Sequence, residues 1–227
     1  MTDYATRHAA VLDRIQRSCA RAGRSAEDVT LVAVSKGHAV DAIRALHTIG
    51  VRDFGESYAQ AWREKADHVP DDVRWHFVGH LQSNKVRYLA DRVHLVHSVD
   101  RPSLVAEIDR RWSGPCEILL QVNVAEDPAK SGAAADEAFT LLDRALTAER
   151  IVVRGLMTIP PLGDDPEDSR PAFAGLRELF ERIRDRYGLE QFDQLSMGMT
   201  DDLEVAVEEG ATIVRVGTAL FGPRSYA

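Results

Sequence analysis

The stretch TLVAVSKGHAVDAIRALHTIGVRDFGES, residues 30–57, sets the pattern of the whole chain. Its first segment, TLVAVSK (30–36), has the apolar and β-branched composition of a buried strand. RDFGES (52–57) is a second strand-like segment, and the residues between the two follow a helical pattern. This order predicts a βαβ unit, in which a helix joins two parallel strands.

The rest of the chain repeats this alternation. Six further strand-like segments follow, with helical patterns between them: RWHFVG (74–79), HLVHSVD (94–100), EILLQVNV (117–124), IVVRGLMTIP (151–160), QLSMG (194–198) and TIVRVGT (212–218). The whole set predicts an α/β protein whose parallel strands close into a (β/α)8 TIM-type barrel. An open, doubly wound sheet is the alternative.

Two helices are clear from the spacing of apolar residues. Leu12 and Ile15 lie at helical spacing within residues 5–22, which predicts an extra amphipathic helix before the first strand. An apolar stripe along residues 171–188 predicts a second helix, with Gly188 as its C-cap.

The composition predicts a single domain over residues 1–227, without a membrane span. No apolar run approaches the roughly 18 residues that a span requires, and the N-terminus shows no secretory signal. A formal charge of −8 argues against broad binding to nucleic acids or anionic membranes. Cys19 and Cys116 lack CxxC spacing and indicate reduced thiols. We therefore expect a cytoplasmic protein without a bound metal and, since no oligomerisation cue is present, a monomer.

Lys36 ends the first strand-like segment, although lysine gives up its hydration reluctantly. Strand alternation puts Val32, Val34 and Lys36 on one side of the strand. If the valines face the barrel interior, Lys36 lies at the barrel mouth, where active sites of this fold occur. Partial desolvation there favours a neutral amine, which is the nucleophile that forms an imine. A lysine that merely reaches solvent from a strand end is the alternative.

The ends of strands seven and eight suit a phosphate group, which many barrels hold at this place. Gly198 and Gly217 allow a close backbone approach, and Ser196 and Thr218 offer hydroxyl donors. Thr200 offers another hydroxyl, and its alternative role is to cap the following helix.

Two acidic residues limit where an anion could lie. Asp201 and Asp202 begin the helix after strand seven, where they suit the helix dipole but would repel a phosphate. We therefore expect the phosphate nearer Ser196, Gly217 and Thr218.

Arg215, His76 and Met157 are further candidates. Arg215 shares its strand parity with Gly217 and is expected at the mouth, as a donor to a ring nitrogen or a phosphate. A buried ion pair with a carboxylate such as Glu56 is the alternative for Arg215. His76 and Met157 lie within strand-like segments and are core residues by default, although Met157 could equally pack against a flat ring.

A primary amine, a phosphate cradle and an inward-facing arginine fit one cofactor well. Pyridoxal 5′-phosphate has an aldehyde for the lysine, a phosphate for the strand ends and a pyridine nitrogen for the arginine.

The sequence resembles the pyridoxal phosphate homeostasis protein family, which is similar to the alanine racemase barrel domain standing alone. The resemblance spans nearly the whole chain and rests on AVSK (33–36), FGESY (54–58), WHFVGHLQSNK (75–85), RGLMTIP (154–160) and LSMGMTDDLEVAVEEGATIVRVGTALFG (195–222). It implies a single pyridoxal-phosphate-binding barrel of the alanine racemase N-terminal type over residues 1–227.

The resemblance also implies roles for individual residues. It implies that Lys36 forms the Schiff base and that Arg215 faces the pyridine nitrogen. It implies that Ser196, Gly217 and Thr218 hold the phosphate, with Gly198 close by. 

Three further positions are implied less directly. The resemblance places His76 and Met157 near the cofactor. Ser57 occupies a position where the family usually has asparagine, and its hydroxyl is a shorter hydrogen-bonding group.

The function implied by the resemblance is covalent, reversible binding of pyridoxal phosphate and a contribution to its intracellular homeostasis. Catalytic turnover is not expected to be robust, and pyridoxal-phosphate-dependent apoenzymes are the expected recipients. An amino-acid racemase that uses the cofactor is the alternative, and a Schiff-base aldolase is a third hypothesis. Racemisation needs an acid–base group on each face of the α-carbon, and two-domain racemases take one from a C-terminal domain that we expect this chain to lack.

Overall fold

The computed structural model describes residues 3–161 and 163–223, which form a closed barrel of parallel strands. The strands pair in the order of the sequence, and β8 pairs with β1 to close the barrel. They are β1 (Thr30–Val34), β2 (Asp53–Glu56), β3 (Arg74–Phe77), β4 (Leu95–Val99), β5 (Cys116–Gln121), β6 (Ile151–Met157), β7 (Gln194–Ser196) and β8 (Ile213–Val216). The predicted (β/α)8 barrel is therefore confirmed, and the open sheet is wrong.

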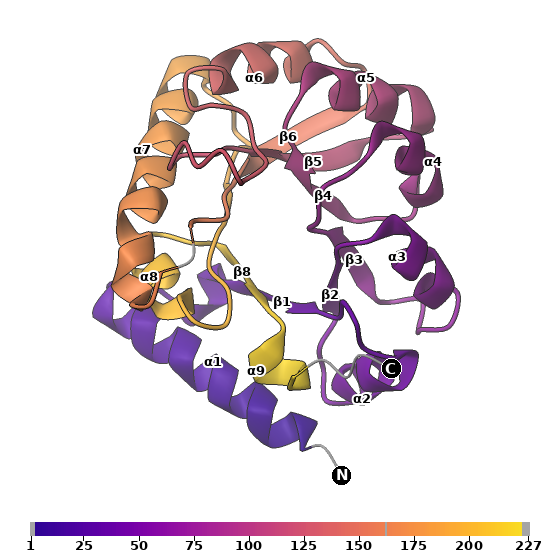
Figure 1. The fold of residues 1–227 in the computed structure, drawn as a ribbon, viewed down its shortest axis with the longest axis vertical. Coiled ribbons are helices and arrows are strands. Elements are labelled where there is room, and N and C mark those ends of the chain that lie inside the picture. The colour runs from indigo at the N-terminus through magenta and orange to yellow at the C-terminus, as the bar shows by residue number, and fades with distance from the viewer. Residues whose placement is uncertain (1–2, 162, 224–227) are drawn as a thin grey trace.

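The helices form a ring outside the barrel (Figure 1). They are α1 (Tyr4–Arg21), α2 (Val40–Thr48), α3 (Ala59–Ala66), α4 (Val86–Leu89), α5 (Pro102–Arg111), α6 (Ala138–Leu146), α7 (Arg170–Tyr187), α8 (Leu203–Glu208) and α9 (Thr218–Phe221). Short 3-10 turns lie at Ala26–Asp28, Ser83–Lys85 and Pro166–Ser169. No helix of the described residues is long and apolar enough to cross a membrane.

The core has two parts, because each strand alternates its side chains between the barrel interior and the helix layer. The larger part lies between the strands and the surrounding helices. The smaller part fills the barrel interior and comprises Val32, Val34, Val78, Leu95, Leu119, Met157 and Ile213. The interior valines of β1 have the parity that was predicted to place Lys36 at the mouth.

The predicted strand segments are correctly placed but extend too far at their carboxyl ends. Lys36 lies two residues beyond β1, and Thr218 is the first residue of α9 rather than the last of a strand. The alternation of side chains continues past the last paired residue, so composition alone does not show where the backbone ladder ends. The residues after that point form the loops of the barrel mouth.

Helix α1 exists as predicted and lies beside α8 and α9 (Figure 1). Its buried face differs from the prediction, because Leu12 is 44% exposed while Val11 and Ile15 are buried. Arg14 Nε lies 2.5 Å from Glu204 Oε1, which ties α1 to α8. The predicted C-cap of α7 is confirmed, since Gly188 is left-handed with φ 62°.

Candidate functional site

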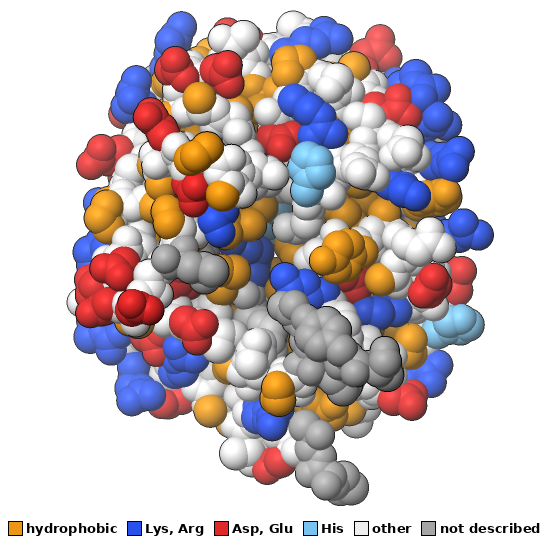
Figure 2. Space-filling view, in the orientation of Figure 1, with side chains coloured by type: hydrophobic (Ala, Val, Ile, Leu, Met, Phe, Trp, Pro, Cys, Tyr) orange, Lys and Arg blue, Asp and Glu red, His pale blue; other side chains and the backbone are white. Residues whose placement is uncertain are grey.

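A cavity of about 180 Å³ opens at the carboxyl ends of the strands. It is lined by Val34, Lys36, His38, Ser57, Val78, Ile159, Met199, Thr200, Asp201, Arg215, Gly217 and Thr218. A second cavity shares Lys36 and Ser57 with it and continues toward Lys130. Figure 2 shows a hollow near the centre of this face, bordered by hydrophobic and basic side chains. Both cavities are therefore at the barrel mouth, where active sites of this fold occur.

A larger cavity of about 460 Å³ lies outside the barrel, between α7 and the loops at the opposite end. Its lining includes Arg184, Asp193 and Thr212, and Thr212 directly precedes β8. This is the amino-terminal side of the strands, where barrel active sites do not occur. The mouth cavity is therefore the better candidate.

Lys36 is half-buried and lines both mouth cavities. The backbone before it is held on two sides. The Ser35 amide donates to the Gly55 carbonyl at 2.8 Å, and the Ser35 carbonyl accepts from Lys65 Nζ at 2.9 Å. These bonds fix the start of the Lys36 side chain at the rim of the barrel, which supports the interpretation of Lys36 as a site residue.

A buried ion pair supports this rim from below. Lys65 Nζ lies 2.6 Å from Glu56 Oε2, and the Glu56 side chain is fully buried. The second carboxylate oxygen, Oε1, accepts from the Ser57 amide at 2.7 Å. A single carboxylate therefore links the loop that carries Lys36, through Lys65, with the loop that carries Ser57.

Ser57 lines both mouth cavities together with Lys36. A glycine is required beside it, because a Cβ on Gly79 would lie only 2.1 Å from the Ser57 carbonyl oxygen. The two loops thus pass each other with no room for a side chain.

Gly217 and Thr218 line the cavity where α9 begins. Thr200 lies across from them, and its hydroxyl accepts from the Ala219 amide at 3.4 Å. The Thr200 carbonyl accepts from Arg14 Nη2 at 2.7 Å, so α1 braces this loop. The extra N-terminal helix therefore supports the site directly.

The expected capping role of Thr200 is wrong, because Asp202 is the N-cap position of α8. Asp202 is buried, and it accepts from the Met199 amide at 2.6 Å and from the Ser169 hydroxyl at 3.0 Å. Both of its carboxylate oxygens thus accept hydrogen bonds from neighbouring residues. Asp201 is exposed and lines the same cavity as Gly217 and Thr218.

Arg215 is 4% exposed and reaches the cavity floor from β8. Its Nη1 donates to Ser196 Oγ at 2.7 Å, and its Nη2 donates to the Thr158 carbonyl at 2.9 Å. Burial lowers the pKa of Arg215 to about 10, which still leaves the guanidinium charged at neutral pH. The alternative of an ion pair with Glu56 is wrong, because Glu56 pairs with Lys65.

Four of the predicted residues are buried and are not among the lining residues of the cavity: His76, Met157, Ser196 and Gly198. Met157 is fully buried in the interior cluster. Gly198 has φ 89°, and a Cβ there would lie 2.4 Å from the Ala206 Cβ, so its demonstrated role is to let α8 pack closely. Ser196 and His76 belong to a buried polar chain.

Several lining residues were not singled out as site residues from the sequence. Val78 and Ile159 form apolar walls, and each follows a strand by one or two residues. His38 also lines the cavity and stacks on Phe221, with ring centroids 4.8 Å apart. The sequence did contain a signal for them. Val78 lies two residues after His76 and Ile159 two residues after Met157, so each is expected to face the same side as that strand residue.

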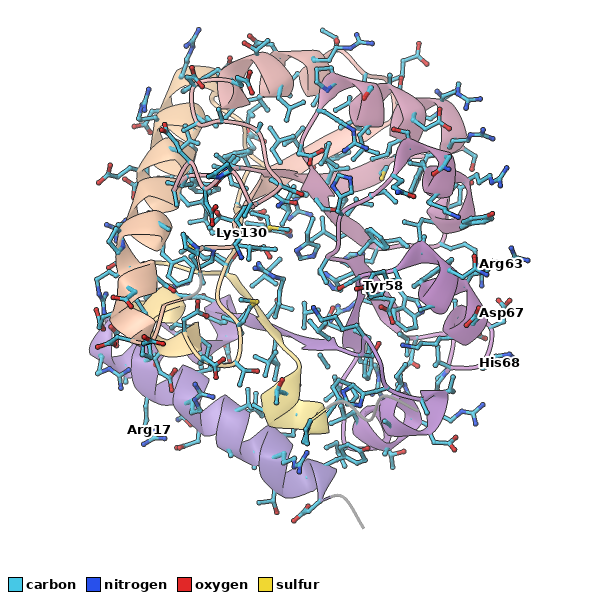
Figure 3. All side chains as sticks on the ribbon, viewed as in Figure 1. Arg17, Tyr58, Arg63, Asp67, His68 and Lys130 are labelled. Atoms are coloured by element: carbon cyan, nitrogen blue, oxygen red, sulfur yellow. The ribbon has the colours of Figure 1, made fainter. Side chains whose placement is uncertain are left out.

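Loops after β2 and β5 carry polar groups to the outer part of the mouth. Tyr58 and Lys130 lie toward the centre of the ring of helices, whereas Arg63, Asp67 and His68 lie at its outer edge (Figure 3). Tyr58 and Lys130 both line the second mouth cavity, and the Tyr58 side chain is 66% exposed. Among residues 3–161 and 163–223 there is no group of three or more acidic, histidine or cysteine side chains that could hold a metal ion.

The fold and site define a (β/α)8-barrel protein with a lysine and a buried arginine at its mouth. Residues 11–225 match the family described as "Alanine racemase, N-terminal domain". The "Pyridoxal phosphate homeostasis protein" of Aquifex aeolicus is 43% identical over 220 residues, covering 95% of this chain and 96% of that protein. The protein of that name from Pseudomonas aeruginosa is 42% identical over 230 residues, covering 100% of this chain and 98% of that protein.

A solved structure agrees with these sequence matches. PipY of Synechococcus elongatus, described "with PLP bound", has a TM-score of 0.79 and 33% identity, covering 92% of this chain and 100% of that one. The chain therefore belongs to the alanine racemase N-terminal domain family and, within it, to the pyridoxal phosphate homeostasis proteins. The resemblance inferred from the motifs is confirmed.

Proposed function

We propose that this protein binds pyridoxal phosphate reversibly through a Schiff base to Lys36 and contributes to its homeostasis without robust turnover. The observation that carries the proposal is one cavity that brings together Lys36, Arg215 and the hydroxyl-bearing loops after β7 and β8. The names of the relatives and the bound PipY structure support the same cofactor.

The residues present fit the chemical groups of this cofactor. Lys36 supplies an amine for the aldehyde, and Val34, Val78 and Ile159 supply apolar walls for a flat ring. Arg215 supplies a fixed donor at the cavity floor. When bound, the cofactor supplies a carbonyl group and an electron-withdrawing ring.

Lys36 forms the covalent bond in this proposal. Its neutral amine attacks the aldehyde carbon, a C=N bond forms, and the aldehyde oxygen leaves as one water molecule. Adding water to the C=N bond restores the aldehyde and the free lysine. No oxidant, metal or second cofactor is needed, so the same step serves both capture and release.

Retention without turnover is tested in one experiment. The loaded protein is dialysed against buffer in deuterated water containing alanine, while released cofactor and deuterium in the α-position are measured. We expect slow release and little exchange, because racemisation requires a second acid–base group opposite Lys36. Exchange at about 1 s⁻¹ or faster, lost in Lys36→Ala, would establish the racemase alternative instead.

The phosphate is proposed to lie at the start of α9, between Gly217, Thr218 and Thr200. Ser196 was part of the predicted cradle, but its hydroxyl already bonds Arg215 and lies below the cavity lining. We therefore assign Thr200 the hydroxyl contact that the sequence had suggested for Ser196.

Thr200→Val together with Thr218→Val is expected to weaken pyridoxal phosphate by at least tenfold and pyridoxal much less. Each lost hydrogen bond to a charged group is worth roughly 1.5–3 kcal/mol, and pyridoxal lacks that charge. Ligand titration of the variant measures both constants. Thr6→Val, an exposed threonine on α1, is the matched control. An equal loss for both ligands would contradict this placement of the phosphate.

The domain organisation, the oligomeric state and the location are also part of the proposal. A single domain over residues 1–227, a monomeric state and a cytoplasmic location are proposed from the sequence, and the two buried, unpaired cysteines are consistent with a reducing compartment. Pyridoxal-phosphate-dependent apoenzymes are the proposed recipients, since reversible capture leaves the aldehyde intact for transfer.

A further inference from the structure

A continuous chain of buried side chains crosses the barrel interior beneath the cavity. Arg215 Nη1 lies 2.7 Å from Ser196 Oγ, and Ser196 Oγ lies 2.8 Å from His97 Nδ1. His97 Nε2 lies 2.9 Å from His76 Nδ1, and His76 Nε2 lies 3.0 Å from Asp53 Oδ1. Five side chains from β8, β7, β4, β3 and β2 are thus connected in one line.

The Asp53 end of this chain determines the direction of its hydrogen bonds when both imidazoles are neutral. An arginine can only donate, so Ser196 accepts from Arg215 and keeps its own proton available for His97 Nδ1. An ionised aspartate can only accept, so His76 must carry its proton on Nε2. His97 then carries its proton on Nε2 as well and donates it to the bare Nδ1 of His76. With both rings neutral, the bare Nδ1 of His97 accepts from the Ser196 hydroxyl, so all donors point toward Asp53, and the Arg215 end is compatible with this direction.

The protonation states that this direction requires agree with the burial of the groups. Burial lowers the pKa of His97 well below its usual value, and the positive charge of Arg215 lowers it further. Burial also lowers the pKa of His76, although Asp53 acts in the opposite direction. Both imidazoles are therefore neutral at physiological pH.

Charged neighbours also act on the pKa of Asp53, at the opposite end of the chain from Arg215. Burial would raise the pKa of Asp53, but hydrogen bonds from His76 and Arg74 more than offset it, and the pKa is lowered. His94 touches the His76 ring edge at 5.5 Å between centroids, yet it is exposed and outside the chain. Asp53 is thus the negative end of a line whose positive end is Arg215.

We propose that His97 and His76 are positioning residues, each neutral with its proton on Nε2, that connect Asp53 to Arg215 and hold Arg215 as a fixed donor. The proposal rests on the proposed function insofar as the donor serves the ring of pyridoxal phosphate. No carboxylate is hydrogen-bonded to Arg215 among the bonds found in the described residues. Burial lowers the pKa of Arg215, the charge of the buried Asp202 acts to raise it, and the polarised chain adds compensation from Asp53 at a distance.

This arrangement has a consequence for the ring. Because Ser196 can only accept from Arg215, the guanidinium keeps its own protons and stays oriented toward the cavity. A ring nitrogen that accepts from Arg215 stays unprotonated, since a second positive charge there would be repelled. An unprotonated ring withdraws electrons less strongly than a protonated one.

The first test uses the cofactor-free protein. Nitrogen-15 NMR of labelled histidines should show His76 and His97 as neutral rings protonated on Nε2 at neutral pH. Asp53→Asn, which has nearly the same shape but can donate, should allow the second tautomer at His76. The control His94→Asn removes an exposed neighbouring ring and should change neither tautomer. A charged His97, or a proton on Nδ1 of either ring in the unchanged protein, would overturn the proposal.

The second test uses ligand binding. His97→Asn retains an acceptor near Ser196 but loses the link to His76, so pyridoxal phosphate and pyridoxal should both bind about tenfold more weakly. The absorption spectrum of the bound ligand and its dependence on pH should also shift, and a melting curve confirms that the variant folds. Unchanged affinity and spectrum in a folded variant would contradict the positioning role.

The two tests separate this inference from the proposed function. If the apo-protein shows the expected tautomers but Lys36 binds no cofactor, the inference about His97 and His76 stands and the proposed function fails. If Lys36 binds the cofactor but the tautomers are mixed, the proposed function stands and the inference about His97 and His76 is wrong.

Discussion

Replacing Lys36 by alanine is expected to abolish the borohydride-stable adduct with pyridoxal phosphate while leaving the barrel folded. The reason is that the Schiff base needs a primary amine at the mouth, and alanine removes it without disturbing the bonds that hold Ser35. Absorbance of the bound cofactor and mass mapping after reduction measure the loss. Circular dichroism and a melting curve measure the fold.

The other lysines provide the control. Lys130 lines the second mouth cavity, so Lys130→Ala is the matched variant and should retain the adduct at Lys36. In Lys36→Ala, a main adduct at Lys65, Lys85 or Lys130 would show that the amine was wrongly assigned. Loss of the adduct in Lys130→Ala, with Lys36 intact, would have the same meaning.

Among the variants named here, Lys65→Met is expected to lower the free energy of unfolding most. It leaves the carboxylate of Glu56 buried without its partner, and breaking a buried pair from one side costs about 3–5 kcal/mol. For a chain of this size the melting temperature should fall by on the order of 10 °C. Thermal and denaturant unfolding measure both quantities.

Two further variants distinguish a lost charge pair from a lost side chain. Adding Glu56→Gln to Lys65→Met removes the unpaired charge and should recover part of the stability, because a buried amide costs less than a buried carboxylate. Lys85→Met is the control, since Lys85 lies over the Tyr88 ring on the outer side and contacts no buried acid among its described contacts. A loss in Lys85→Met equal to that in Lys65→Met would contradict the role of the pair.

The sequence by itself determined the barrel and the direction of its key side chains. Strand composition and alternation are local properties with a period of two residues, so Val32 and Val34 predicted where Lys36 would lie. The same parity predicted that Arg215 faces the mouth. Local signals also placed α7 and its left-handed cap at Gly188.

Local patterns were less informative at element boundaries. Leu12 has the spacing of an apolar face but is exposed, because the face of α1 that is buried depends on where α8 and α9 lie. Thr200 looked like a cap, but Asp202 takes that position and leaves the Thr200 hydroxyl beside the cavity. In both cases several residues satisfy the same local rule, and only packing selects among them.

The tertiary structure alone decided which polar residues meet inside the barrel. His97 and Ser196 are 99 residues apart in sequence, on β4 and β7, which are not neighbouring strands of the barrel, and no motif connects them. Glu56 finds Lys65 rather than Arg215 because α3 carries the amine back over the rim. A buried polar group takes whichever partner the closed barrel brings within reach, since leaving it unpaired is costly, and that closure is a property of all eight strands together.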